Sequence, residues 1–223
     1  MKCSYRIYNC DVYRFEMPVI RANMYVLIHG NSALVIDPSV RAEADKFLRE
    51  AHIKSCTILL THEHFDHISG VNHLRELFPC QVVSSQMCAE RMADPRKNGA
   101  AHFDALFLNR NDRDQEEMAV EIDKHYSCEA DMTYTGHMEL RWEDLTLVMR
   151  ETPGHSLGSQ IIEIDHKWYF TGDSFIPGRA VITRLPGGSK KQYDTITRPY
   201  LEAIAPGSTI FPGHGKETSY CTD

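Results

Sequence analysis

Residues 57–67 read TILLTHEHFDH, a short apolar run followed at once by four side chains that can bind a metal ion. These side chains are His62, His64, Asp66 and His67. Imidazoles and carboxylates this close together each need a polar partner, because burying such groups without one is unfavourable. A bound cation satisfies all of them together. The stretch therefore predicts a metal site, and the apolar run predicts a strand that ends where the site begins.

The same arrangement, an apolar run followed by a polar side chain, recurs along the chain. It is found at 145–149 before His155, 168–171 before Asp173, 208–211 before His214, and 33–36 before Asp37. Side chains just past the carboxyl ends of neighbouring strands gather at one edge of a sheet, where open α/β folds bind ligands. A glycine precedes His155, Asp173 and His214, which allows a sharp turn that directs each side chain into a common cleft.

The hydrophobic periodicity predicts an α/β protein. Two apolar runs, 24–28 and 33–36, flank Gly30-Asn31 and predict a β-hairpin. Further strands are expected at 57–60, 81–84, 145–149, 160–164, 168–171 and 208–211, and amphipathic helices at 44–51, 68–78 and behind Ser189. The sequence shows no internal repeat, low-complexity tract or linker, so we expect residues 1–223 to form a single domain.

Two of the expected helices have start signals. Ser39 is the expected N-cap of the first helix. Ser189 and Gln192 have the spacing of a capping box at the start of the last helix. One face of that helix is expected to pack on the core; it consists of Tyr193, Ile196, Tyr200 and Ile204.

Charge and composition limit the partners and the compartment. The formal net charge of −7 argues against nucleic acid, because phosphate binding needs a basic surface. No apolar run approaches the roughly 18 residues of a membrane span, and the N-terminus lacks the apolar core of a secretory signal. The seven cysteines form an odd set without a C-x-x-C pair. We therefore expect reduced thiols, a cytoplasmic location and a small-molecule substrate. The oligomeric state is not encoded in any pattern we recognise.

The motif and the three later side chains together resemble a known family. In their order along the chain, His62-x-His64-x-Asp66-His67, His155, Asp173 and His214 resemble the metallo-β-lactamase fold superfamily, and within it the glyoxalase II-like hydrolases. The resemblance extends over residues 23–215. It implies an α/β fold, a four-layer αββα sandwich of two mixed β-sheets flanked by helices.

The resemblance also implies a role for each side chain. One metal ion would be bound by His62, His64 and His155; a second by Asp66, His67 and His214; and Asp173 would bridge the two. Asp37 matches an aspartate that supports the ligands from behind.

Imidazoles and carboxylates suit zinc better than calcium or magnesium, so we expect two zinc ions, with iron or manganese as alternatives. Two divalent ions, two carboxylates and a bridging hydroxide carry about one net positive charge, which favours an anionic or carbonyl-bearing substrate. The expected function is hydrolysis of a thioester, lactone or related ester by a hydroxide that bridges the two zinc ions. Asp66 and Asp173 are the candidate catalytic residues, because either can steer protons.

Two other functions stay open. A persulfide dioxygenase-like oxidoreductase with one iron would use two histidines and one carboxylate, here His62, His155 and Asp173. A non-catalytic binding module with this fold would not need every ligand to be intact, and all are present. Familiar β-lactamases lack the bridging aspartate, so Asp173 argues against antibiotic hydrolysis.

Some neighbouring residues have less certain roles. Glu63 alternates with the histidines and is expected to point away from the metals. Residues 85–138 and 175–188 are expected to shape the pocket. Four cations after Asp173 either hold an acidic substrate or belong to a solvated loop; they are Arg179, Arg184, Lys190 and Lys191.

Overall fold

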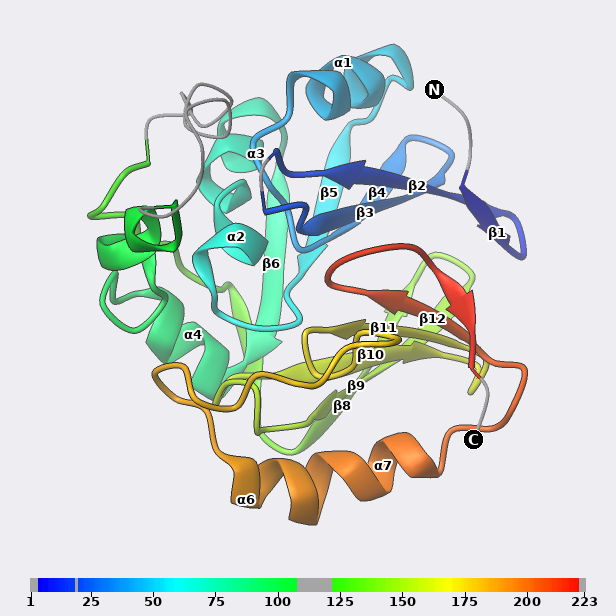
Figure 1. The fold of residues 1–223 in the computed structure, drawn as a ribbon. Helices are drawn as coiled ribbons and strands as arrows, with labels where there is room; N and C mark the ends of the chain where they lie inside the picture. Colours follow the sequence, from blue (N-terminus) through cyan, green and yellow to red (C-terminus); the bar gives the residue numbers. More distant parts are fainter. Residues whose placement is uncertain (1–3, 19, 108–121, 221–223) are drawn as a thin grey trace.

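Two β-sheets pack face to face, with helices on both outer faces (Figure 1). The computed structural model describes residues 4–18, 20–107 and 122–220. The arrangement is the expected four-layer αββα sandwich of two mixed sheets, so the predicted fold is confirmed. No helix in the described part of the chain is long and apolar enough to cross a bilayer.

The first sheet has seven strands in chain order. They are β1 (Tyr5–Ile7), β2 (Cys10–Glu16), β3 (Asn23–His29), β4 (Ser32–Ile36), β5 (Ser55–Leu59), β6 (Cys80–Ser85) and β7 (Met132–Tyr134). Strands β1 to β4 pair antiparallel, and β4 to β7 pair parallel. The predicted hairpin at Gly30-Asn31 is confirmed as the turn between β3 and β4. The helical segments that follow these strands are α1 (Ala42–Glu50), α2 (Phe65–Ile68), α3 (Val71–Leu77), α4 (Gln86–Met92) and the 3₁₀ segment η1 (Ala100–Phe107).

The second sheet has six strands in the order β13-β12-β11-β10-β9-β8. In chain order they are β8 (His137–Trp142), β9 (Leu145–Glu151), β10 (Gln160–Ile164), β11 (Trp168–Gly172), β12 (Thr209–Pro212) and β13 (Thr218–Ser219). Among these six described strands, β11 and β12 pair parallel and the other neighbours pair antiparallel. Its outer face is covered by a continuous helical segment made of α6 (Lys190–Gln192), the π-helical turn η2 (Tyr193–Thr197) and α7 (Arg198–Glu202).

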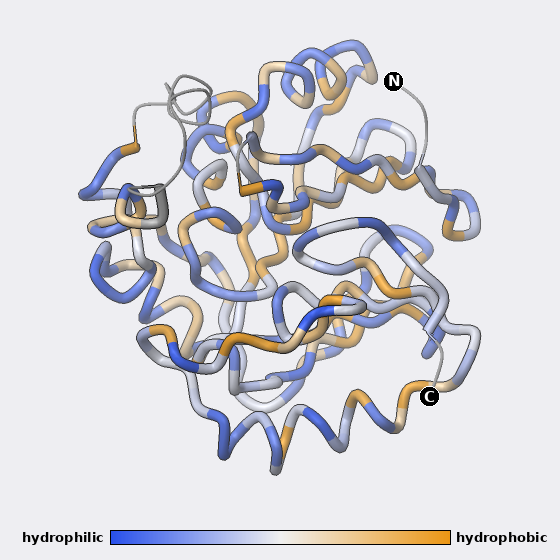
Figure 2. The backbone as a smooth tube through the Cα atoms, in the orientation of Figure 1, coloured by the Kyte–Doolittle hydropathy of each residue, from blue (hydrophilic) through white to orange (hydrophobic). Residues whose placement is uncertain are grey.

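Three apolar layers hold the four layers of secondary structure together. Ala33 and Val35 of β4 face α1 and α3, while Leu34 and Ile36 of the same strand face the second sheet, as the pleat of a strand buried on both sides requires. The third layer lies between the second sheet and α7, where Leu201 is buried. Figure 2 shows hydrophobic residues concentrated along the strands, and hydrophilic and hydrophobic residues alternating along α6 to α7.

Three local predictions were wrong. Helix α1 has Arg41 rather than Ser39 as its N-cap. The predicted helix at 68–78 is divided, because α2 ends at Ile68 and α3 begins at Val71. Gly70 lies between them against the chain at Ser39, where an added Cβ would come within 2.8 Å of the backbone.

The third correction concerns the last helix, although its N-cap was predicted correctly, since the Ser189 hydroxyl accepts from the Gln192 amide. Ile196 was expected on the core face but is 47% exposed, and Thr197 is buried in its place. The π-helical turn η2 contains more residues per turn than an α-helix, so the inward position moves one residue along the chain.

Replacing Phe170 with Ala should lower the free energy of unfolding by roughly 3–5 kcal/mol. Phe170 is 1% exposed between the two sheets and stacks on Phe211 with ring centroids 4.6 Å apart. Chemical denaturation measures the loss. Ile196→Ala is the exposed control and should change stability by less than about 0.5 kcal/mol; equal losses in the two variants would contradict the assignment of the inter-sheet core.

Candidate metal centre

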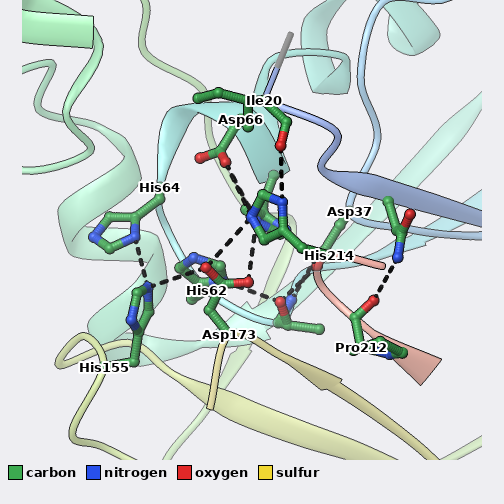
Figure 3. A network of polar contacts seen from close by, with 12 residues as sticks. Ile20, Asp37, His62, His64, Asp66, His155, Asp173, Pro212 and His214 are labelled. Atoms are coloured by element: carbon green, nitrogen blue, oxygen red, sulfur yellow. Dashed lines mark hydrogen bonds and ion pairs between the residues drawn. The ribbon is translucent and has the colours of Figure 1, made fainter. Parts of the chain in front are cut away.

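The predicted ligands come together at one edge of the two sheets (Figure 3). They lie in the segments that follow β5, β9, β11 and β12, and two of them, Asp66 and His67, belong to the short helix α2. The strand ends of both sheets therefore supply the side chains, as the repeated pattern of apolar run and polar residue indicated.

The three histidines expected to share one metal form a first cluster. His62, His64 and His155 each place one ring nitrogen so that all lie within 4.8 Å of one another. His155 Nε2 and His64 Nδ1 face each other at 3.0 Å. The three rings come from two loops, with 91 positions between His64 and His155, and the packing of the two sheets brings them together.

A second cluster contains the residues expected to share the other metal. Asp66, His67 and His214 likewise offer atoms within 4.8 Å of one another. His67 Nε2 and His214 Nε2 each lie 3.6 Å from Asp66 Oδ2.

Asp173 contacts both clusters. Its Oδ2 lies 3.7 Å from His155 Nε2 in the first cluster and 3.5 Å from His214 Nε2 in the second. Its Oδ1 lies 3.6 Å from His67 Nε2. This is the position that the resemblance assigns to a bridging ligand.

The polar atoms of the site fit divalent cations better than they fit one another. Among the described residues, His62 Nε2, His67 Nε2 and Asp173 Oδ1 are buried without a hydrogen-bond partner. Two ligand atoms that each lie about 2.1 Å from a tetrahedral zinc ion are about 3.4 Å apart. The separations of 3.5–3.7 Å around Asp173 are close to that spacing and too long for hydrogen bonds.

The two clusters differ in their electrostatics. Burial, followed by the neighbouring histidines, holds the pKa of His62 well below its usual value and lowers that of His64 to about 3. Burial also acts to lower the pKa of His67, but Asp66, Asp37 and Asp173 outweigh it and raise this pKa to about 10. His62 and His64 therefore present neutral imidazoles ready to bind metal, whereas His67 carries a proton that a metal ion would replace.

Asp37 supports the site from behind, as the resemblance implied. Its Oδ2 accepts from His67 Nδ1 (2.9 Å) and from the Thr61 hydroxyl (2.6 Å), and its Oδ1 accepts from the Thr61 amide (2.7 Å). Because the Thr61 hydroxyl donates to Asp37, it accepts from His62 Nδ1 at 3.0 Å. In both His62 and His67, Nδ1 is thereby occupied and Nε2 is left to face the candidate metal centre. Asp37 has a φ of +54°, a conformation that non-glycine residues adopt rarely and often at functional sites.

Backbone carbonyls orient two further histidines. The Ile182 carbonyl accepts from His155 Nδ1 at 2.8 Å, and the Ile20 carbonyl accepts from His214 Nδ1 at 3.1 Å. A metal-binding histidine commonly donates its other ring N–H in this way, which selects the tautomer and the ring orientation.

Two of the glycines before the ligands are required by their surroundings. Gly172 has a φ of +50°, and a Cβ there would lie 2.3 Å from the Thr61 hydroxyl. A Cβ on Gly213 would lie 2.2 Å from Asp173 Oδ1. A side chain at either position would push directly on the candidate ligands or their support.

A cavity of about 140 Å³ opens onto the centre. His155, Asp173 and His214 line it together with Ile176 and residues 179–182. A neighbouring cavity of about 420 Å³ shares Arg179, Ala180 and Val181 with it. Of the two segments expected to shape the pocket, 175–188 does so. The described part of 85–138 contributes no lining residue to either of these two cavities, and 108–121 lie outside the described residues.

The loop cations divide into two groups. Arg179 lines both cavities and Lys190 lines the larger one. Arg184 and Lys191 line neither of these two cavities.

Sequence reasoning missed several supporting residues. Thr61 directly precedes the motif, and that position was the available signal. Arg91 pairs with Glu63, but an arginine on an amphipathic helix gives no indication that it is buried. The prediction that Glu63 points away from the candidate ligands is confirmed, since its carboxylate bonds to Arg91 and Ser156.

The comparison with protein families identifies the class. The profile of the metallo-β-lactamase superfamily matches residues 17–214. The chain belongs to the metallo-β-lactamase superfamily, and the predicted resemblance is confirmed. Membership, together with the clustered histidines and aspartates, implies that the protein binds divalent metal.

Several of the curated relatives are named as hydrolases. The chain is 28% identical over 212 residues to the probable metallo-hydrolase YqgX of Bacillus subtilis, covering 93% of this chain and 92% of the relative. It is 27% identical over 183 residues to a hydroxyacylglutathione hydrolase of Bdellovibrio bacteriovorus, covering 82% of this chain and 58% of that protein. The predicted enzyme class, a hydrolase of the metallo-β-lactamase fold, is confirmed.

Solved structures share the fold. The BLEG-1 B3 metallo-β-lactamase has a TM-score of 0.75 and 26% identity, with 93% of both chains covered. The protein TTHA1623, crystallised in a di-iron-bound form, has a TM-score of 0.70 and 21% identity over 93% of this chain and 94% of its own. At 21% identity the second likeness shows the fold alone.

Asp37→Asn should weaken metal binding by roughly 10- to 100-fold, because the amide supports His67 and Thr61 less well than the carboxylate does. Competition with a fluorescent zinc chelator measures the dissociation constants. Asp45→Asn is a matched control, since Asp45 accepts from His73 at 2.8 Å outside the site. Unchanged zinc affinity in Asp37→Asn would refute the supporting role.

Proposed function

We propose that this protein is a dinuclear zinc hydrolase of a small thioester, lactone or related ester, and that residues 1–223 act as a single domain. The observation that carries the proposal is the position of Asp173, which contacts both the His62/His64/His155 cluster and the Asp66/His67/His214 cluster. The hydroxyacylglutathione hydrolase relative supports the substrate class, because such a substrate is a thioester.

Two bound zinc ions would supply an activated water near neutral pH and a Lewis acid for the carbonyl oxygen. The chain's own part is to hold the ligands and to handle protons. Asp66 and Asp173 keep 13% and 15% of their side chains exposed, so an oxygen of either can take a proton from the nucleophile and pass it to the leaving group. Asp37, Ile182 and Ile20 keep the histidine rings oriented throughout.

The second cluster favours this function over the one-iron dioxygenase. His62, His155 and Asp173 would satisfy a single iron, but that chemistry leaves Asp66, His67 and His214 without a purpose. These three residues are nevertheless grouped, and two of them are held from behind, His67 by Asp37 and His214 by the Ile20 carbonyl. We therefore propose two metals per chain, with zinc as the resident ion.

The walls of the smaller cavity support a substrate with a short acyl part and a negative charge. Ile176, Val181 and Ile182 are apolar, and Arg179 is the one cation among the described residues that line it. An acyl chain can pack on the apolar side chains while a carboxylate pairs with the guanidinium. A leaving group would extend into the larger cavity, which Arg179 also lines.

Location in the cytoplasm also belongs to this proposal. The five cysteines in the described part of the chain are free thiols, which agrees with a reducing compartment.

Asp66→Ala should remove metal and activity together. Elemental analysis of protein purified without added metal should find two zinc ions per wild-type chain and fewer in the variant. Hydrolysis across a panel of thioesters and lactones should fall by at least roughly 10²- to 10³-fold, the loss expected for one major electrostatic stabiliser. Three results would contradict the proposal: turnover by protein from which the metal has been removed, one iron per chain together with oxygen consumption, or hydrolysis of a cephalosporin and of none of the esters.

Arg179→Met should raise KM for carboxylate-bearing substrates by roughly 10-fold, the value of a charge-assisted contact, and leave KM for neutral esters of similar size nearly unchanged. Steady-state kinetics with paired charged and neutral substrates measure the difference. Arg184→Met is a control in the same loop. An equal rise for charged and neutral substrates would show that Arg179 does not recognise charge.

A further inference from the structure

Glu63 is a fully buried carboxylate in the middle of the metal motif, and the reaction proposed above does not use it. It lies between His62 and His64 in sequence and is 0% exposed. Its Oε1 accepts from Arg91 Nε, and its Oε2 accepts from the Ser156 hydroxyl at 2.8 Å. Because Ser156 follows His155, Glu63 connects the two loops that supply the first histidine cluster.

Arg91 extends the connection to a third segment. Its side chain is 11% exposed on α4, and its Nη2 donates to the Pro186 carbonyl at 2.9 Å. Pro186 belongs to the loop at 176–188 that lines the cavity over the candidate metal centre. One guanidinium therefore joins the buried Glu63 to the loop at the mouth of the site.

The same loop returns to the candidate ligands. Its Ile182 carbonyl accepts from His155 Nδ1, and its residues 176 and 179–182 line the small cavity. A displacement of this loop would alter both the orientation of His155 and the shape of the substrate pocket.

Two glycines leave space for the ion pair. A Cβ on Gly158 would lie 2.5 Å from Glu63 Oε2, and a Cβ on Gly187 would lie 2.4 Å from Arg91 Nη2. Backbone thus closely surrounds both ends of the pair: the loop after His155 lies against Glu63, and the 176–188 loop lies against Arg91.

Stability alone does not explain why charges occupy this position. Removing two charges from water is costly, and buried ion pairs can often be replaced by apolar side chains without loss of stability. An ion pair is directional, unlike an apolar contact, because the guanidinium must present its donors to the carboxylate and to the Pro186 carbonyl in one orientation.

We propose that Glu63 and Arg91 form a clasp that positions the 176–188 loop over the candidate metal centre and thereby sets substrate affinity. Both are positioning residues: they act through His155 and the loop and not on the reacting atoms. The inference rests on the proposed hydrolase function only for its kinetic readout.

The test compares Arg91→Met with the double variant Glu63→Met/Arg91→Met in the full-length, metal-loaded protein. Arg91→Met leaves the Glu63 carboxylate buried without its cation, so its melting temperature should fall. The double variant removes both charges and should recover most of that fall. Arg75→Met is the control, because it breaks the Arg75–Asp131 ion pair (2.7 Å) away from the site.

If Glu63 and Arg91 position the 176–188 loop, the order of this loop should not recover in the double variant, although the melting temperature does. In the double variant, amide hydrogen exchange of peptides covering 176–188 should be at least roughly 10-fold faster than in wild type. KM should rise by roughly 10- to 100-fold, because misplaced positioning groups hold the substrate less well, while kcat changes less. Arg75→Met should show neither effect.

Exchange and KM that return to wild-type values together with the melting temperature would overturn the clasp and leave a merely structural ion pair. Absence of hydrolysis by the wild-type enzyme would instead contradict the proposed function. The exchange measurement still decides the clasp in that case, because it needs no substrate.

Discussion

Buried polar atoms that lack partners inside the protein are the constraint on which this site depends. His62 Nε2, His67 Nε2 and Asp173 Oδ1 lie in the interior without a hydrogen-bond partner, and the last two are 3.6 Å apart, a separation that suits a shared cation. Leaving such groups unpaired costs free energy, so the loops that carry them must be held by the rest of the fold. Metal binding relieves that cost, which links the occupancy of the site to the stability of the loops around it.

Both sheets help to hold these groups in place, because strands of each sheet lead into the segments that carry the candidate ligands. Apolar layers cover each sheet on both faces, and the strands that precede the candidate ligands, β5, β9, β11 and β12, end at the same edge. The loops beyond the strand ends are then fastened individually: Asp37 holds His67, the Ile182 carbonyl holds His155, and the Ile20 carbonyl holds His214.

The fold and the candidate ligands were largely predictable because they depend on local patterns. Apolar runs predict the strands, and each group of candidate ligands lies within a few residues after such a run, as at Leu59 and His62. The errors occurred where packing overrides local preference. A π-helical turn replaced Ile196 with Thr197 on the core face, and Gly70 divided a helix because another segment lies against it. Neither event leaves a mark in the periodicity of the sequence.

The sequence by itself determined the class of the protein, the seven candidate ligands and the order in which they occur. The tertiary structure decided which side chains support them: that Thr61 orients His62, that Arg91 reaches Glu63 and the Pro186 carbonyl, and that Arg179 lines the cavity while Arg184 does not. The reason is physical. A ligand motif is set by the chemistry of the ion and repeats in a recognisable spacing, whereas a hydrogen bond between distant segments depends on how whole layers pack against each other, and no short stretch of residues records that packing.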